Sequence, residues 1–418
     1  MSSEVFKRRE GTLFCEQVCL ETVARSVPTP FYIYSSRDVE DRYRELERAF
    51  SSVPHLTCYA LKANSQPELL RILSANGAGA EVVSGAELQL ARAVGFPSEK
   101  IVFSGVGKTE QELTAGLAAN VHLFTVESEG ELVHLERLAG QLGRSARIAL
   151  RINPNVDPKT HPHIATGVES AKFGLDSQVA LELYTRHREF PHLEFIGVHT
   201  HIGSQLTSIE PLVETARLIE DLVSELLDKG VPLREVDWGG GLGISYEGEN
   251  VPTFDEYADC ILPWISRSGL RVILEPGRTL VGPCGALVLK VLYLKKVHGR
   301  RFAVVDGGLN DLLRPALYNA YHRIEPVVSK EESAETVDVV GAVCESSDVF
   351  GRDRRLGDLR QGDMLCVLDV GAYGFSMSSN YNLRPRPAEV LTEGETFRIV
   401  REAETTEDLI ARELGARS

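Results

Sequence analysis

Short hydrophobic runs alternate with helix-forming stretches along most of the chain. The runs are rich in β-branched and aromatic residues, and stretches such as 67–77 and 109–120 separate them. Gly77, Gly95 and Gly143 close predicted helices, where a left-handed C-cap residue is needed. Eight strands that alternate with helices predict a closed parallel (β/α)8 barrel, and an open doubly wound sheet is the alternative. The predicted strands are 56–62, 80–84, 101–105, 122–126, 147–153, 195–201, 235–240 and 271–277.

After residue 280 the pattern changes to strand-like runs and turns without long helices, which predicts a second, all-β domain. The strand-like segment 30–35 precedes the first barrel unit and is expected to pair with this β-domain. The predicted domains are a barrel at 36–280 and a β-domain made of 281–418 together with 1–35.

The composition points to a small-molecule partner. The chain has 418 residues, 43% of them hydrophobic, and a formal net charge of −15, which opposes binding to nucleic acid or anionic membranes. We find no signal peptide and no apolar stretch long enough to span a membrane, so a cytoplasmic location is expected. Seven cysteines without a C-x-x-C pair do not suit a disulfide framework.

The barrel prediction can be tested on the sequence, because catalytic side chains of such barrels collect at the C-terminal ends of the strands. Polar residues and glycines do occur near the end of run after run. They are Lys62, Glu81, Ser84, Arg151, Asn153, His199, His201, Gly239 to Gly241, Glu275 and Arg278.

Lys62 ends the first predicted strand, in Y-A-L-K-A-N. A lysine in such a place is more often a surface residue whose stem lies on apolar groups. Held among apolar walls of a barrel, however, it would lose proton affinity by desolvation. A neutral amine forms a Schiff base with an aldehyde, so we interpret Lys62 as a candidate covalent catalyst.

Three neighbouring strand ends carry groups that bind phosphate. The triple glycine in D-W-G-G-G-L-G lets backbone N–H groups approach an anion, although a tight turn explains it equally well by itself. Ser204 and Arg278 supply a hydroxyl and a guanidinium. Together these groups predict a phosphorylated cofactor.

His199 and His201 leave a metal-dependent hydrolase open as an alternative, because residues i and i+2 of a strand share a side. A further ligand at another strand end is not evident. A flat imidazole stacked on a cofactor ring explains one histidine equally well, and we favour His201 because it precedes I-G-S. His161 and His163 lie in a proline-containing loop and are expected to be solvated. No metal is predicted.

Eight motifs resemble those of the diaminopimelate decarboxylases, which are fold type III pyridoxal 5′-phosphate enzymes related to ornithine decarboxylase and alanine racemase. The resemblance covers about residues 13 to 390, and the acidic tail after Val400 matches nothing in it. The motifs are Y-A-L-K-A-N, K-F-G at 172–174, H-I-G-S at 201–204, G-G-G-L-G at 239–243, E-P-G-R at 275–278, R-P-A-L-Y at 314–318, C-E-S-S-D at 344–348 and G-A-Y-G-F-S-M-S-S-N-Y-N at 371–382.

For the cofactor, the resemblance implies that Lys62 forms the Schiff base with pyridoxal 5′-phosphate and that His201 stacks on its ring. Glu275 would face the pyridine nitrogen and keep it protonated, which makes the ring a better electron sink. Tyr373 would contact both cofactor and substrate. The implied phosphate region comprises Ser204, Gly239, Gly240, Gly241, Pro276, Gly277 and Arg278.

For the substrate, the resemblance implies a carboxylate clamp of Arg278, Arg314 and Tyr318. Glu345 would contact the distal amino group, and Cys344 would donate the proton. The implied reaction decarboxylates meso-2,6-diaminopimelate to L-lysine and CO₂, the last step of bacterial lysine biosynthesis by the diaminopimelate route.

The resemblance also implies an obligate homodimer in which the segment with Cys344 reaches the partner's cofactor. Two other functions stay open. One is a protein that holds pyridoxal phosphate without turnover, against which the clamp and Cys344 argue. The other is a decarboxylase of a related acyl substrate attached to a carrier protein.

Overall fold

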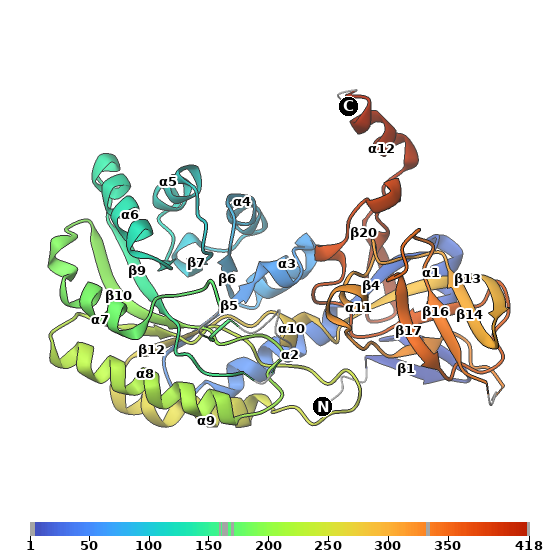
Figure 1. Cartoon of the computed structure of the whole chain (residues 1–418), viewed down its shortest axis with the longest axis horizontal. Helices are drawn as coiled ribbons and strands as arrows, with labels where there is room; N and C mark the ends of the chain where they lie inside the picture. The colour runs from blue at the N-terminus through green and yellow to red at the C-terminus, as the bar shows by residue number, and fades with distance from the viewer. Residues whose placement is uncertain (1–4, 159, 161–165, 169–170, 332–334, 416–418) are drawn as a thin grey trace. The chain divides into compact units, whose positions relative to one another are not determined.

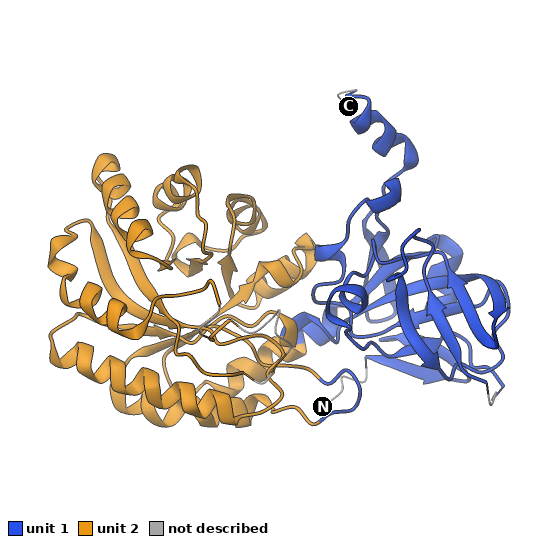
Figure 2. Cartoon of the chain, in the orientation of Figure 1, with its two compact units in different colours: residues 1–40, 245–249, 280–418 blue, residues 41–244, 250–279 orange. Residues whose placement is uncertain are grey.

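The computed structural model describes residues 5–158, 160, 166–168, 171–331 and 335–415. These residues form two compact units, which Figure 2 shows in different colours. The barrel unit comprises 41–244 and 250–279, and the β-rich unit comprises 1–40, 245–249 and 280–418. Within the described residues, no helix is long and apolar enough to cross a membrane.

Eight parallel strands close the barrel unit, because the eighth strand along the chain pairs with the first. This closure confirms the predicted (β/α)8 barrel and rules out the open sheet. Six of the observed strands are one to three residues shorter than predicted, since several predicted runs included the polar residues that follow each strand. The fifth strand has the predicted length, and the sixth is one residue longer. The strands are β5 His55–Ala60, β6 Gly79–Val82, β7 Ile101–Phe103, β8 Leu123–Val126, β9 Ala146–Ile152, β10 Leu193–Thr200, β11 Glu235–Asp237 and β12 Arg271–Leu274.

Local sequence signals fix where the barrel helices begin and end (Figure 1). Thr109 and Thr253 each form a capping box with the glutamate three residues later. Gly95 and Gly143 end their helices in the left-handed conformation, as predicted. The helices are α2 Ser36–Ala49, α3 Pro67–Ala75, α4 Gly85–Val94, α5 Glu110–Ala119, α6 Glu129–Leu142, α7 Ser177–Thr185, α8 Glu210–Asp228, α9 Phe254–Ser268 and α10 Arg278–Val281.

The β-rich unit is built on a sheet in the order β17-β16-β14-β13-β4-β19-β20. Strand β4 (Phe31–Ser35) lies between β13 and β19, which confirms that the N-terminal strand pairs with the C-terminal ones. A separate three-stranded sheet holds β1 to β3. The other strands are β1 Phe6–Arg9, β2 Thr12–Cys15, β3 Val18–Cys19, β13 Gly285–Val297, β14 Arg300–Val305, β15 Ile324–Pro326, β16 Val337–Val340, β17 Val349–Arg354, β18 Met364–Val367, β19 Ala388–Glu393 and β20 Thr396–Arg401.

Helices in the β-rich unit are short, as the sequence predicted. They are α1 Leu20–Ser26, α11 Arg314–Tyr318 and α12 Thr406–Glu413. The acidic tail, for which the sequence offered no structure, forms α12, capped by Thr405. Single 3₁₀ turns are η1 Leu61–Ala63, η2 Ser98–Lys100, η4 His187–Glu189, η5 Phe375–Met377 and η6 Tyr381–Leu383.

The β-rich unit has its own hydrophobic core, to which both ends of the chain contribute. Buried side chains of β2 and α1 pack against those of β13, β18 and β19. The core includes Leu13, Leu20, Phe31, Val288, Leu368 and Val390. The N-terminal segment is therefore an integral part of this unit.

Candidate active site

Lys62 lies at the C-terminal mouth of the barrel, in the 3₁₀ turn η1 that directly follows β5. Its Nζ donates to both carboxylate oxygens of Glu81, over 2.9 and 2.8 Å, from the strand next to β5. The prediction that apolar walls desolvate Lys62 is wrong, because 41% of its side chain is exposed. The buried member of the pair is Glu81, whose side chain is 1% exposed.

Burial raises the pKa of Glu81 to about 7, although the positive charge of Lys62 lowers it. A carboxylate with this pKa can pair with an ammonium group and can also accept its proton. The pair therefore gives Lys62 a route to the neutral amine that does not require desolvation. The sequence signal was a carboxylate inside an apolar strand, which we noted without assigning it a role.

Glu275 follows β12, and its carboxylate is surrounded by buried polar groups. Ser104 Oγ donates to Oε1 over 3.4 Å, and His199 Nε2 lies 3.4 Å from Oε2. Burial and the negative charge of Glu275 hold the pKa of Asp237 well above its normal value. Burial also acts to raise the pKa of Glu275, but contacts with His199 and the charge of Lys62 lower it overall. Glu275 is therefore the ionised carboxylate, and the neighbouring carboxyl group of Asp237 holds its proton more strongly than a free aspartic acid.

The two histidines of H-T-H have different partners. His199 groups with Asp237 and Glu275, and ligand-type atoms of these three residues lie within 4.8 Å of one another. The expectation that no acidic group at another strand end joins His199 is therefore wrong, because β11 and β12 each bring a carboxyl group to it. His201 is not in this cluster. His161 and His163 lie outside the described residues.

His201 contacts the glycine loop instead. Its Nδ1 accepts the backbone N–H of Gly240 over 3.2 Å, so the ring proton is on Nε2. Burial, reinforced by the charges of Arg151 and Lys62, holds the pKa of His201 well below its normal value. The ring is therefore a neutral, oriented aromatic plane, which suits stacking on a flat cofactor.

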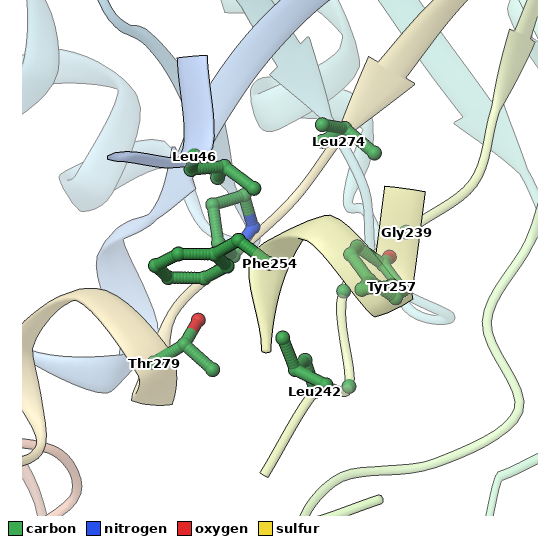
Figure 3. A pocket seen from close by; sticks show the side chains of 10 residues that line it. Leu46, Gly239, Leu242, Phe254, Tyr257, Leu274 and Thr279 are labelled. Carbon is green, nitrogen blue, oxygen red and sulfur yellow. The ribbon is translucent and has the colours of Figure 1, made fainter. Parts of the chain in front are cut away.

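The glycine loop cannot accept side chains. A Cβ on Gly240 would lie 2.2 Å from the carbonyl oxygen of Glu275, and one on Gly241 would lie 2.4 Å from that of Gly203. Gly241 also has φ +108°, which residues with a side chain rarely adopt. Apolar side chains, including those of Phe254 and Tyr257, line a pocket against the loop (Figure 3). The loop thus exposes bare backbone at the barrel mouth, as a phosphate requires.

Two further strand ends complete the phosphate-binding elements. Arg278 donates to Ser204 Oγ over 3.0 Å, so the guanidinium and hydroxyl predicted to hold phosphate are adjacent. The N–H of Ala60, just before Lys62, donates to the carbonyl of Pro276 over 3.0 Å. A Cβ on Gly277 would lie 3.0 Å from a methyl carbon of the lysine turn. The E-P-G-R and Y-A-L-K segments are therefore held together, and this donor set fits a phosphorylated aldehyde cofactor.

A buried ion pair in the barrel was missed by the sequence analysis. Arg151 donates to Glu127 over 2.7 Å, and the other oxygen of Glu127 accepts the N–H of Gly174 over 2.8 Å. The guanidinium of Arg151 also lies over the ring of Phe173, 4.7 Å from its centre. The K-F-G motif is thus docked on the ends of β8 and β9, next to the positive charge of Arg151, which adds to the effect of burial in lowering the pKa of His201.

Arg314, a predicted substrate residue, begins α11 in the β-rich unit and is 5% exposed. It donates to Nε2 of His322 over 2.8 Å, while Nδ1 of His322 is 3.0 Å from the carbonyl of Leu368. The guanidinium also lies over the ring of Tyr246, 4.8 Å from its centre. This stacking and the histidine hold the guanidinium in one orientation. Tyr318 ends the same helix.

The remaining predicted residues also belong to the β-rich unit. Cys344 and Glu345 are exposed, and the N–H of Cys344 donates to Oδ1 of Asn382 over 3.0 Å. Tyr373 is half-buried and has φ +56°, an uncommon value for a residue with a side chain. The predicted cofactor-binding groups other than Tyr373 thus gather in the barrel unit, and the predicted substrate residues other than Arg278 lie in the β-rich unit.

Comparison with known proteins gives one consistent family. The model of the pyridoxal-dependent decarboxylase, pyridoxal binding domain, matches residues 36–282. The diaminopimelate decarboxylase of Aquifex aeolicus is 44% identical over 403 residues, which cover 96% of both chains. The diaminopimelate decarboxylase of Helicobacter pylori, solved in complex with L-lysine, gives a TM-score of 0.92 at 42% identity and covers 95% of this chain and 100% of that chain. The Methanocaldococcus jannaschii enzyme with L-lysine gives 0.94 at 40% identity, with 99% of this chain and 98% of that chain covered.

The chain therefore belongs to the pyridoxal-dependent decarboxylases, whose cofactor suits the lysine, glycine loop and arginine at the barrel mouth. Within that class, it is a member of the diaminopimelate decarboxylase family. The resemblance seen in the motifs is thereby confirmed, as are the alanine racemase-like fold, the lyase class and the pyridoxal phosphate cofactor.

Proposed function

We infer that the protein converts meso-2,6-diaminopimelate to L-lysine and CO₂ with pyridoxal 5′-phosphate as its cofactor. The observation that carries this inference is the Lys62–Glu81 pair at a barrel mouth that also holds an ionised Glu275. Family membership names the substrate. The direct test is incubation of the purified protein with meso-diaminopimelate, followed by assays for CO₂ and L-lysine. Absence of both products would overturn the inference.

For the cofactor, Lys62 supplies the amine that holds it covalently, and Glu81 takes up the proton that the ammonium must lose. Bound cofactor supplies a protonated ring that accepts the electrons left when CO₂ departs. Glu275 would face the pyridine nitrogen and keep it protonated, because its carboxylate is buried and ionised. The neutral imidazole of His201 would stack on the face of the cofactor ring. The phosphate would be held by Ser204, Gly239, Gly240, Gly241, Pro276, Gly277 and Arg278.

For the substrate, Arg278, Arg314 and Tyr318 bind the distal carboxylate, and Glu345 binds the distal ammonium. Tyr373 contacts both cofactor and substrate, and Cys344 donates the proton that replaces CO₂. An oriented guanidinium distinguishes diaminopimelate from ornithine and lysine, because these have no distal carboxylate. Binding them would leave the buried guanidinium without the carboxylate that it is oriented to receive. A carrier-bound acyl substrate would also lack this carboxylate, so activity on free diaminopimelate separates the two functions.

We further propose a homodimer with shared active sites, in which residues 36–280 bind the cofactor and 281–418 with 1–35 complete the partner's site. Cys344 and Glu345 are exposed, as residues that serve another subunit need to be. All seven cysteines are free thiols, which suits a cytoplasmic location.

Mixed dimers test the shared sites. Lys62→Ala and Cys344→Ala homodimers should each be nearly inactive, because one lacks the covalent amine and the other lacks the proton donor. If chains exchange at random, half of the dimers are heterodimers, each with one doubly altered site and one intact site. Co-expression should therefore restore roughly a quarter of wild-type activity.

Differently tagged chains and a pull-down establish that heterodimers form. If they form and the mixture stays as inactive as its parents, Cys344 acts within its own chain or is not the donor. Heterodimers of wild-type and Cys344→Ala chains, isolated through both tags, provide the control for the altered chain, because one intact site in each heterodimer should keep half of wild-type activity.

A further inference from the structure

The segment that carries Cys344 is tied down at both of its ends by Asp348. One carboxylate oxygen of Asp348 accepts the N–H of Leu309 and the other accepts that of Val343, each over 2.7 Å. The N–H of Gly341 donates to the carbonyl of Asp348 over 3.1 Å. A Cβ on Gly341 would lie 2.3 Å from the Asp348 carboxylate, so this close loop requires glycine. The backbone on either side of Cys344 is thus anchored.

The backbone N–H of Cys344 itself points away from this loop, to Oδ1 of Asn382. Asn382 lies in η6 and has φ +58°, a left-handed conformation that asparagine adopts more readily than most residues. The N–H of Ser379, three residues earlier, donates to the carbonyl of Asn310 over 2.8 Å. This contact ties the segment of Asn382 to the turn that also holds Asp348.

Position 382 therefore needs two properties, a left-handed backbone and a side-chain acceptor of fixed reach. Asparagine and aspartate have both, glycine has only the first, and alanine has neither. The thiol of Cys344 is exposed, and Asn382 accepts the backbone N–H of the same residue. This contact limits rotation of the Cys344 peptide and hence the direction of its Sγ.

We propose that Asn382 is a positioning residue for the decarboxylase reaction, which orients the thiol of Cys344 through the backbone N–H of that residue. This inference rests on the proposed function, in which Cys344 delivers the proton. Asn382 need not touch substrate or cofactor for this role. The motif G-A-Y-G-F-S-M-S-S-N-Y-N then serves the site through two residues, Tyr373 near its start and Asn382 at its end.

The test compares Asn382→Gly with Asn382→Asp in the full-length holoenzyme. Loss of one hydrogen bond in Asn382→Gly should lower kcat about five- to tenfold, with KM for diaminopimelate within about twofold. Asn382→Asp keeps the acceptor and should retain kcat within about twofold. The second readout is the alkylation rate of Cys344 by iodoacetamide, followed by peptide mass. This rate should rise about threefold in Asn382→Gly and stay unchanged in Asn382→Asp.

Asn380→Ala is the matched control, because Asn380 belongs to the same motif but bonds elsewhere. Its side-chain amide donates to the carbonyl of Arg384 over 3.0 Å and to Glu404 over 2.5 Å. This variant should lose thermal stability, while kcat and the alkylation of Cys344 stay at wild-type values. Asn382→Gly with unchanged kcat and unchanged alkylation would overturn the proposal, as would equal losses in the glycine and aspartate variants.

Cys344→Ala separates this inference from the proposed function. If Cys344→Ala keeps full kcat, Cys344 is not the proton donor, and the role of Asn382 fails with it. If Cys344→Ala is inactive while Asn382→Gly behaves as wild type in both readouts, the proposed donor survives and only the positioning role is wrong.

Discussion

Replacement of Lys62 by alanine is expected to lower kcat by at least about a thousandfold, the scale seen when a covalent catalytic group is removed. The purified variant should also lose the visible absorbance of lysine-bound cofactor. In the wild-type protein, borohydride should fix the cofactor to the peptide that contains Lys62. The measurements are CO₂ release, an absorbance scan and mass analysis of the labelled peptide.

Two further variants test whether the effect is specific to Lys62 and whether it involves Glu81. Lys229→Ala removes an exposed lysine at the end of α8, which forms a surface ion pair with Glu225, and should leave activity unchanged. Glu81→Gln keeps the shape of the buried partner but removes its charge and its capacity to accept a proton. It should slow attachment of added cofactor to the cofactor-free protein. Borohydride labelling at a lysine other than Lys62 would show that the central assignment is wrong.

Replacement of Arg314 by alanine should cost about 2–5 kcal/mol of transition-state binding for diaminopimelate, since it removes one partner of a charge-assisted pair. This corresponds to a loss in kcat/KM of roughly thirtyfold to a few thousandfold. Cofactor content should be unchanged. Arg314→Lys keeps the charge but cannot reproduce the planar contact with His322 and the ring of Tyr246, so it should rescue only part of the loss.

The cofactor content of the Arg314 variants separates a role in substrate binding from a role in the fold or in cofactor binding. A variant that loses cofactor together with activity would show that Arg314 supports the fold or the phosphate region, and the clamp would be wrong. Thermal unfolding of both variants provides the control, because Arg314 is buried and alanine leaves His322 without this contact. A variant of normal stability and cofactor content, with normal kcat/KM, would contradict the clamp equally.

Most of the fold is predictable from the sequence because its signals are local. Eight apolar runs alternate with helices, and caps such as Thr109 and Gly95 mark helix ends without help from distant residues. Parallel strands in a barrel also end at one mouth, so the strand order alone brings Lys62 and Glu275 to the same side. The predicted ends of the strands were less accurate, because polar residues that follow a strand were included in several of the predicted strands.

What the sequence could not predict depends on which side chains meet across strands. Glu81 is the partner of Lys62 because β5 and β6 pair with Ala60 opposite Glu81. The exposure of Lys62 follows from its 3₁₀ turn rather than from its neighbours in the sequence. The H-T-H motif divides between two partners because β11 and β12 bring Asp237 and Glu275 to His199, while the glycine loop accepts His201.

The sequence by itself determined the barrel, the added β-rich unit, the family and the residue types of the site. These follow from periodicity and from motifs that are continuous in the chain. Only the tertiary structure decided the directions in which the pKa values of Glu81, Asp237 and Glu275 shift and the contact between Asn382 and Cys344. The reason is physical, because pKa values and hydrogen bonds depend on burial and on distances between groups far apart in sequence.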